Sequence, residues 1–324
     1  MLTVHIMGGL GNQLFQIFTL ISTSINSKIP FFFEFIKKPD RADRPFYWDN
    51  CLKKLSVFIK KDIKIHNLYR EPYFHYKTIP HEMFQNNKNT IKLFGYFQSY
   101  KYFDTNKETI CKMININNIK NQVQNTFDNN FFTNTISLHF RIGDYINLQQ
   151  HHPVLKIDYY INSLNQLVKD TEKDNWNVLC FFEKQNEKEV DEKITILIQK
   201  FPNLTFQKID NNLSDWEQMI TMSLCQHNII ANSSFSWWGA YLNDNNNNVY
   251  YPDVWFGPAQ GKKIMNDMFP ENWVKISNIY YEDVNIYCLH YLLPNNKLLE
   301  HEDFKIFFKN LKYKSFILPS NHIC

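Results

Sequence analysis

The chain has 324 residues, 44% of them hydrophobic and 21% charged, which is enough for about two domains with buried cores. Its 35 basic and 32 acidic residues give a formal net charge of +3, which argues against a polycationic nucleic-acid-binding protein. The six cysteines include no CxxC pair and no Cys/His cluster, so neither a zinc site nor a disulfide framework is indicated. The sequence has no signal-peptide pattern and no run of about 18 apolar residues, so we expect a cytoplasmic protein without a membrane span.

The first 35 residues predict a strand, a turn, a helix and a second strand. Residues 3–7 form a short extended run, and GGLGNQ interrupts it. The helix that follows spaces four apolar residues along one face: Leu14, Phe18, Ile21 and Ile25. The run IPFFFEF at 29–35 predicts another buried strand. A strand–helix–strand unit of this kind predicts a parallel sheet.

Glycine is scarce in this chain. An average composition of ~7% would give roughly 23 glycines, whereas this chain has eight. Three of them fall in one turn, at Gly8, Gly9 and Gly11, where we expect a positive φ or a close approach to the backbone. The GGLGNQ spacing is neither a P-loop nor GxGxxG. Asn12, at the exit of the turn, offers an amide to a hydroxyl-bearing ligand.

The chain becomes regular only in its second half. Residues 36–90 are aromatic segments broken by proline, and residues 104–134 predict a helix and a linker. From residue 135 onward we expect strands at 135–142, 177–182, 204–209, 228–231 and 249–252, and helices at 158–171, 186–200, 215–226 and 234–243. Such alternation predicts a doubly wound parallel sheet. The expected fold is therefore α/β, with two Rossmann-like halves that face each other across a cleft.

The strand at 135–142 carries the first candidate site. It places His139 and Arg141 side by side at its carboxyl end, on the face opposite its apolar residues, and Gly143 and Asp144 follow. A guanidinium is permanently charged, and its fork of N–H groups fits phosphate oxygens. The pattern predicts a phosphate-binding Arg141. The alternative is a plain Arg141–Asp144 salt bridge with a surface histidine.

A second candidate site lies in ANSSFSWWGA. Asn232, Ser233 and Ser234 connect a buried strand to the next helix. The free N–H groups of a helix N-terminus bind anions, so we expect a second phosphate contact here. Ordinary N-capping is the alternative. Trp237 and Trp238 are expected in the core rather than under a sugar ring.

Other polar motifs favour structural roles. Ser214 and Glu217 match the S-x-x-E capping-box pattern ahead of an apolar run. His151 and His152 have no metal-ligand spacing, and the sequence contains neither G-x-S-x-G nor HExxH. Electrostatic catalysis on a phosphorylated substrate, without a metal, is the chemistry that remains.

Five motifs occur in an order that resembles one enzyme family. They are GGLGNQLFQ at 8–16, GYFQSYKYF at 95–103, HFRIGDY at 139–145, HHPVLKIDYY at 151–160 and MSLCQHNIIANSSFSWWGAYLN at 222–243. The set resembles the α-1,2-fucosyltransferases of glycosyltransferase family 11. The HxRxGD segment is also similar to that of the α-1,6- and protein O-fucosyltransferases.

The resemblance implies a GT-B fold, GDP-L-fucose as donor, inversion at the fucose anomeric carbon, and no metal or other cofactor. Arg141 would bind the β-phosphate and neutralise the charge on the departing GDP, with Asp144 as the orienting partner of Arg141 or of a ligand hydroxyl. His139 would lie against the nucleoside or the sugar. Further donor contacts would come from Gly9, Gly11, Asn12, Glu217, Asn232, Ser233, Ser234 and Phe235. Of these, Asn12 would reach the fucose or the phosphate from the opposite domain.

Two segments depart from the family pattern. The family usually has Glu-Asp where this chain has Glu217 and Gln218. Related enzymes use a carboxylate near this point to recognise guanine, so either Glu217 takes that role or guanine selectivity is looser. The usual Ser-Asp-Asp after the strand at 177–182 is replaced by Glu183, Lys184 and Gln185.

These interpretations divide the chain into an acceptor-side domain at 1–130, a GDP-sugar-binding domain at 131–280 and an extension without an assigned role at 281–324. We expect transfer of L-fucose from GDP-L-fucose to a glycan hydroxyl, with O2 of galactose as the acceptor atom. The alternatives are a different donor or acceptor, or a glycan- or nucleotide-binding protein without turnover.

The acceptor side is the least defined part of the sequence. No acceptor base is evident, and the departing phosphate is one candidate to take the proton. Tyr47, Trp48 and Tyr73 would either stack on sugar rings or belong to the core. The oligomeric state is not indicated.

Overall fold

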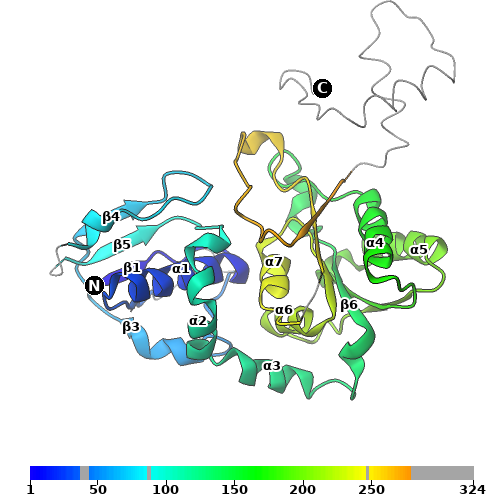
Figure 1. Cartoon of the computed structure of the whole chain (residues 1–324), viewed down its shortest axis with the longest axis horizontal. Helices are drawn as coiled ribbons and strands as arrows, with labels where there is room; N and C mark the ends of the chain where they lie inside the picture. The colour runs from blue at the N-terminus through cyan, green and yellow to red at the C-terminus, as the bar shows by residue number, and fades with distance from the viewer. Residues whose placement is uncertain (37–43, 86–88, 246–247, 279–324) are drawn as a thin grey trace, which may run out of the picture. The chain divides into compact units, whose positions relative to one another are not determined.

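Two parallel sheets organise the chain (Figure 1). The computed structural model describes four stretches, 1–36, 44–85, 89–245 and 248–278. They belong to one compact unit, in which we refer to residues 1–130 as the amino-terminal half and to 131–278 as the carboxy-terminal half. The predicted extension at 281–324 lies outside the described residues.

Three parallel strands form the sheet of the amino-terminal half. Their order is β1 (Leu2–Val4), β5 (Ile91–Phe94) and β4 (Asn67–Arg70). A separate parallel pair joins β2 (Phe33–Glu34) to β3 (Ile59–Lys60). This half is therefore parallel, as expected, but its main sheet is smaller than that of a full doubly wound domain.

The predicted strand at 29–35 is only partly formed. Its start lies beside β1, since the Leu2 N–H donates to Pro30 O at 2.8 Å and the Phe32 N–H donates to Leu2 O at 2.9 Å. Pro30 has no N–H to extend this ladder. The chain then diverges from β1, and the regular strand β2 pairs with β3 instead.

Helix α1 (Leu10–Ser27) is buried on nearly every side rather than on one face. On the predicted face, Leu14, Phe18 and Ile21 are buried, but Ile25 in the last turn is exposed. Four polar side chains of the other faces are buried as well: Gln13, Gln16, Thr19 and Ser22. The reason is that α1 contacts both β1 and α7 (Ser234–Tyr241), a helix of the other half.

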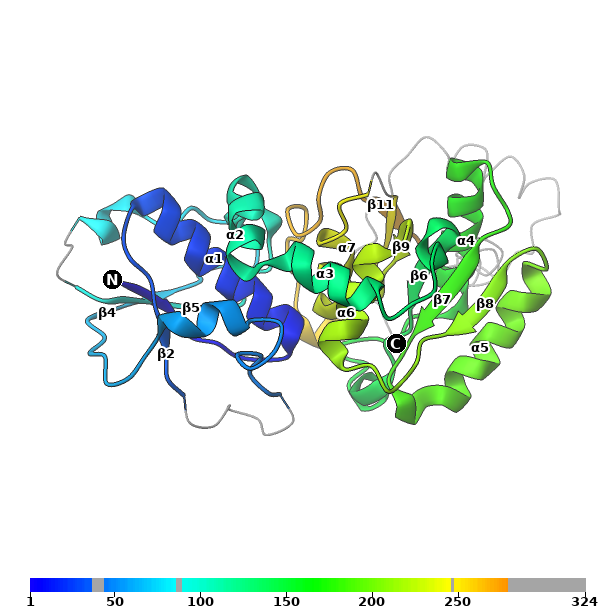
Figure 2. The ribbon, with the colours of Figure 1, turned by 90° about the horizontal axis from the view of Figure 1, so that it is seen from below.

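Two helices follow the first sheet, where the sequence predicts one helix and a linker. They are α2 (Lys107–Ile114) and α3 (Ile116–Gln124), and α3 packs against a helix of the second half (Figure 2). Short 3-10 helices fill the connections: η1 (Lys53–Phe58), η2 (His81–Phe84), η3 (Tyr100–Tyr102), η4 (Asp104–Asn106), η5 (Phe131–Asn134), η6 (Gly143–Asn147), η7 (Lys184–Asn186) and η8 (Pro258–Gln260).

Six parallel strands form the sheet of the carboxy-terminal half, in the order β11-β10-β9-β6-β7-β8. Their bounds are β6 (Thr135–His139), β7 (Asn177–Phe181), β8 (Thr205–Lys208), β9 (His227–Ile229), β10 (Val249–Pro252) and β11 (Val274–Ile276). Counted from β6, this is the strand order of a Rossmann sheet. The helices of this half are α4 (Ile157–Thr171), α5 (Glu187–Lys200), α6 (Asp215–Leu224) and α7.

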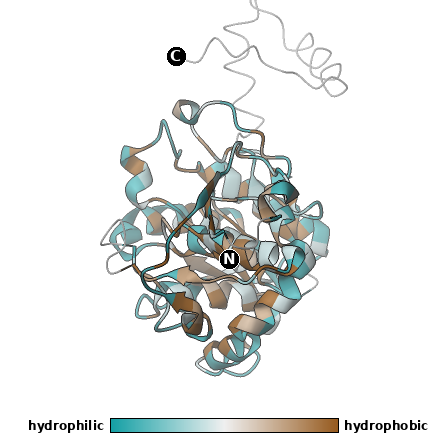
Figure 3. Cartoon of the chain, turned by 90° about the vertical axis from the view of Figure 1, so that its left-hand side faces the viewer, coloured by the Kyte–Doolittle hydropathy of each residue, from teal (hydrophilic) through white to brown (hydrophobic). Residues whose placement is uncertain are grey.

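The sequence pattern of the carboxy-terminal half is confirmed element by element, and β11 is an addition to it. The α/β class and the two parallel-sheet halves of the expected GT-B fold are confirmed as well. Figure 3 shows hydrophobic residues concentrated on the inner strands and helices, with hydrophilic residues along the outer loops.

An aromatic cluster joins the two halves. Trp238 of α7 is fully buried, and its ring lies 4.5 Å from that of Phe18 and 5.4 Å from that of Phe103. Trp237 lies 4.4 Å from Phe15 of α1. The prediction that both tryptophans belong to the core is confirmed, and the core they form is continuous between the halves.

Replacing Trp238 with alanine should lower the free energy of unfolding by about 3–5 kcal/mol, because a fully buried indole leaves a cavity between the halves. Denaturant unfolding followed by far-UV circular dichroism measures this loss. The control is Ile198→Ala on the exposed side of α5, which should change stability by less than about 0.5 kcal/mol. A loss below about 1 kcal/mol for Trp238→Ala would contradict a shared core.

Candidate active site

A cavity of about 760 Å³ opens between the two halves. Its volume lies within the usual range for small-molecule sites. The amino-terminal half lines it with the glycine turn at 8–13 and with Arg44, and the carboxy-terminal half lines it with His139, Arg141 and the 232–235 turn. The expected cleft between the sheets is therefore present, and it brings together all but one of the predicted site residues.

Two helix N-termini meet in this cavity. Helix α1 begins after Gly8 and Gly9, and α7 begins after Ser233. A Cβ on Gly11 would lie 2.7 Å from the Phe235 nitrogen and collide with the backbone of Ser234. Only glycine permits this approach of the two first turns. The N–H groups of both helix starts, which carry partial positive charge, therefore face one cavity.

The serine turn shows the N-capping that the sequence left as an alternative. Ser233 is the N-cap of α7, and its Oγ accepts a hydrogen bond from the Phe235 N–H at 3.3 Å. Asn232 is buried, and its Nδ2 donates to Pro153 O at 2.9 Å and to Trp255 O at 3.3 Å. Asn232 therefore fixes the surrounding loops, while Ser234 and Phe235 line the cavity.

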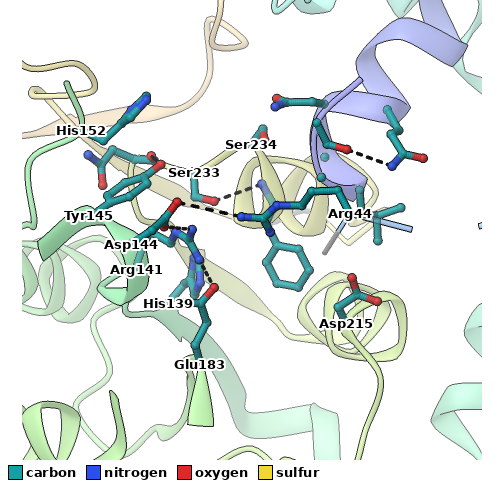
Figure 4. A pocket seen from close by; sticks show the side chains of 18 of the residues that line it. Arg44, His139, Arg141, Asp144, Tyr145, His152, Glu183, Asp215, Ser233 and Ser234 are labelled. Carbon is teal, nitrogen blue, oxygen red and sulfur yellow. Dashed lines mark hydrogen bonds and ion pairs between the residues drawn. The ribbon is translucent and has the colours of Figure 1, made fainter. Parts of the chain in front are cut away.

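Arg141 forms the electrostatic centre of the site (Figure 4). Its guanidinium donates to the carboxylates of Asp144 and Glu183, and its side chain is only 13% exposed. A Cβ on Gly143 would collide with the Glu183 carboxylate, and Gly143 also has a φ of +32°. Burial alone would lower the pKa of Arg141, but Glu183 and Asp144 outweigh it and raise the pKa. The guanidinium is permanently charged.

Glu183 could have been found from the sequence. The register of the parallel pair β6–β7 sets His139 opposite Phe181. Two residues farther along both chains, Arg141 meets Glu183. The Arg141–Asp144 salt bridge of the alternative interpretation is present. The alternative interpretation also expected His139 at the surface, and this is wrong because His139 is buried.

The ring of His139 is neutral. Burial, with help from the charge of Arg141, lowers the pKa of His139 to about 3. Its ring lies 5.6 Å from that of Phe235, and its Nδ1 has no hydrogen-bond partner in the described part of the chain. His139 can therefore contact a ligand, but it cannot act as a base near neutral pH.

Arg44 brings a second guanidinium to the site from the amino-terminal half. Its Nη2 lies 4.0 Å from Asp144 Oδ2, so Asp144 lies between two arginines (Figure 4). A Cβ on Gly9 would lie 3.8 Å from the Arg44 side chain. Sequence reasoning misses Arg44 because the 36–90 segment has no periodic pattern that would fix its direction.

Glu217 is the predicted site residue that does not reach the cavity. Its Oε2 accepts hydrogen bonds from the Ser214 N–H at 2.8 Å and from the Ser214 hydroxyl at 2.5 Å, which completes the capping box of α6. The cavity instead contains Asp215 and Gln218 of the same helix. The Tyr47 hydroxyl donates to Asp215, and burial and this contact raise the pKa of Tyr47 well above its usual range. Tyr47 is thus buried against Asp215.

Asn12 lines the cavity from the start of α1. Its Oδ1 accepts a hydrogen bond from Gln98 Nε2 at 2.7 Å, which leaves its Nδ2 to face a ligand. Gln13 has a structural role, since its Nε2 donates to Gly8 O at 3.0 Å and to Pro45 O at 2.8 Å. These contacts tie the glycine turn to the segment that carries Arg44.

The described residues contain neither a candidate metal site nor a candidate membrane span. No three His, Cys, Asp or Glu side chains in the described stretches are grouped so that they could hold a metal ion. None of the helices in those stretches is long and apolar enough to cross a bilayer. Arginine and lysine side chains and two helix N-termini bring positive charge to the cavity.

The model of the family described as glycosyl transferase family 11 matches residues 1–277. Alpha-1,2-colitosyltransferase of Escherichia coli is 26% identical over 297 residues, 84% of this chain and 97% of the relative. The O-antigen biosynthesis glycosyltransferase WbnK of Escherichia coli is 30% identical over 204 residues, 58% of this chain and 62% of the relative. Galactoside 2-alpha-L-fucosyltransferase of Caenorhabditis elegans is 24% identical over 295 residues, 85% of this chain and 79% of the relative. The family match spans both sheets and every motif of the cavity, and this chain belongs to glycosyltransferase family 11.

Proposed function

We propose that this glycosyltransferase transfers L-fucose from GDP-L-fucose to O2 of a galactose in an acceptor glycan, with inversion at the anomeric carbon and without a bound metal. The observation that carries the proposal is the position of Arg141, a fixed cation at the carboxyl end of β6 in a cavity where two helix N-termini meet. Ligands of parallel α/β sheets bind at that edge. An arginine fork beside a helix N-terminus suits a diphosphate.

The phosphates must compete with carboxylates for Arg141. Side-chain exposure is 47% for Asp144 and 32% for Glu183, so both carboxylates have room to move into solvent. In the free enzyme they orient the guanidinium and compensate its charge. When GDP-L-fucose binds, its β-phosphate replaces at least one of them, while Ser233, Ser234 and the first turn of α1 contact the remaining phosphate oxygens.

In this proposal guanine binds at the end of the cavity where Asp215 and Gln218 lie. Guanine presents two adjacent donors, its ring N–H and its exocyclic amine, and a carboxylate can accept both. Asp215 supplies a carboxylate there, and although its oxygens accept hydrogen bonds from the Tyr47 hydroxyl and the Trp216 N–H, each oxygen keeps a second lone pair for guanine. This contact replaces the one expected of Glu217, whose carboxylate is used in the capping box.

The reaction is a single displacement. The acceptor oxygen forms a bond to the anomeric carbon, and the bond from that carbon to the β-phosphate oxygen breaks. The bonding electrons remain on GDP, and the acceptor hydroxyl releases its proton. Arg141 is closest to the oxygen that gains charge, so it stabilises the transition state more than the ground state.

A second donor is supported by one observation. The relative that this chain covers over 97% of its length is named a colitosyltransferase. Colitose is L-fucose without its 3-hydroxyl, so the same phosphate and guanine contacts serve both donors. Discrimination between them then depends on a hydrogen bond to that hydroxyl.

The proposal is tested by incubating the chain with GDP-L-fucose, GDP-colitose, GDP-mannose or UDP-galactose and an array of disaccharides, in the presence of EDTA. We expect fucosylated product on galactose-terminated acceptors, identified by mass and linkage analysis. Activity with GDP-colitose alone would move the assignment to the second donor. Transfer from UDP-galactose, or loss of transfer in EDTA that added metal restores, would refute the proposed donor or the proposed metal independence.

Arg141→Lys should lower kcat of transfer by ~10²–10³-fold, because lysine keeps the charge but loses the fork that holds the phosphate oxygens. Initial rates of GDP release measure the change. The matched control is Arg70→Lys at the end of β4, where the guanidinium stacks over Phe94 outside the cavity. A wild-type rate in Arg141→Lys would contradict the role given to Arg141.

Arg44→Ala should weaken GDP binding by roughly tenfold, the usual effect of losing one hydrogen bond to a charged group. Guanosine binding should stay unchanged, because the nucleoside has no phosphate for Arg44 to contact. Isothermal titration calorimetry with both ligands separates the two effects. Equal weakening of GDP and guanosine would show that Arg44 acts on the fold of the site instead.

A further inference from the structure

The end of the cavity away from Asp215 is lined with rings (Figure 4). The first ring is that of Tyr145, whose centre lies 4.8 Å from the Arg141 guanidinium. Tyr145 stacks on His152 at 4.9 Å, and His152 lies 5.7 Å from Phe256. We call Tyr145, His152 and Phe256 the aromatic end. Tyr96 of the other half lines the same cavity and is 44% exposed.

Displacement geometry places the acceptor at this end. In an inverting displacement the attacking oxygen approaches opposite the leaving group, so the acceptor lies beyond the sugar as seen from the diphosphate. With the phosphates at Arg141 and guanine toward Asp215, sugar and acceptor occupy the aromatic end. Aromatic faces bind the C–H faces of sugar rings by burying apolar surface. The placement rests on the proposed function.

The attacking hydroxyl loses a proton, and the cavity has few groups to receive it. Asp144 and Glu183 are ion-paired with Arg141, and Asp215 accepts the Tyr47 hydroxyl. His139 is buried too deeply to be protonated. Among the carboxylates and histidines that line the described cavity, this leaves His152 as a neutral base that is engaged in no described ion pair.

We propose that the imidazole of His152 accepts the proton of the attacking hydroxyl of a neutral sugar that stacks against Tyr145 and Phe256. The acceptor oxygen bonds to the anomeric carbon as its proton moves to a ring nitrogen of His152. The bond from the carbon to the phosphate oxygen breaks, and GDP leaves with the electron pair. The imidazolium then releases its proton to water once the product has left.

The surroundings of His152 suit this role. Burial, together with the charges of Lys263, His151 and Arg141, lowers the pKa of His152, while Asp144 raises it. The imidazole is therefore mostly neutral at pH 7. The Nζ of Lys263 lies 4.0 Å from the ring centre of Phe256. Tyr145 holds the ring in place by stacking and donates its hydroxyl to Asn232 O at 3.1 Å.

The test compares His152→Gln with His151→Gln, using GDP-L-fucose and lactose. Glutamine keeps hydrogen bonding but takes up no proton. His151 is exposed on the same loop, with Gln260 beside its Nδ1, which makes it a matched control. We expect kcat for transfer to fall ~10²–10⁴-fold in His152→Gln, the usual contribution of a general base. GDP affinity in His152→Gln should stay within about twofold of wild type, and His151→Gln should transfer at the wild-type rate.

The pH dependence separates a base from a structural role. A base works in its neutral form, so kcat/KM of the wild type should rise through an apparent pKa below the usual ~6.5 of histidine and level off above it. The residual activity of His152→Gln should lack this acid limb. A wild-type rate in His152→Gln, a retained acid limb, or an equal loss of GDP binding would each overturn the proposal. If the wild type itself neither binds GDP nor consumes the donor, the proposed function fails and this inference with it.

Discussion

The ion pairs of Arg141 hold the site together. Removing a guanidinium from water is expensive, and Asp144 and Glu183 compensate the cost in the free enzyme. They also fix the plane of the fork at the edge of the sheet. In the proposed complex a phosphate replaces one of these carboxylates, and because both carboxylates are partly exposed, neither charge would be left buried and unpaired. The guanidinium is thus oriented before a ligand binds. Its two carboxylate partners take the place that a negatively charged ligand group takes in the proposed complex.

The second constraint is the contact between the first turns of α1 and α7. Gly11 lets them approach, and the aromatic cluster around Trp238 holds them there. The two helix N-termini consequently keep a fixed mutual position, since moving them apart would open the shared core. A donor that contacts both helix ends meets preorganised N–H groups. Movement on binding is then left to the exposed carboxylates rather than to the halves.

The sequence predicts those site residues whose positions depend on strand periodicity or on fixed motif spacing. Strand alternation places His139 and Arg141, and the serine turn and the tryptophan core follow from strand–helix boundaries. The sequence does not predict Arg44, because it lies in a segment without periodicity and its direction follows from the tertiary structure. Asp215 is missed because the family pattern points to Glu217, which lies two residues farther along α6 and whose side chain is therefore turned by about 200°. His152 lies on an irregular loop, so the sequence does not predict the direction of its side chain. In the structure its ring stacks on Tyr145.

The pKa values of the two histidines of this site differ chiefly because His139 is buried more deeply than His152. Both lie near Arg141, whose charge lowers the pKa of each. His139 lies at the end of a fully buried strand, so desolvation lowers its pKa far below physiological pH. His152 sits on a loop, half-buried, with Asp144 partly offsetting the loss of solvent. Groups whose surroundings push their pKa values apart divide the tasks of an active site. In the proposed mechanism this division gives a neutral contact at the phosphates, His139, and a base at the aromatic end, His152.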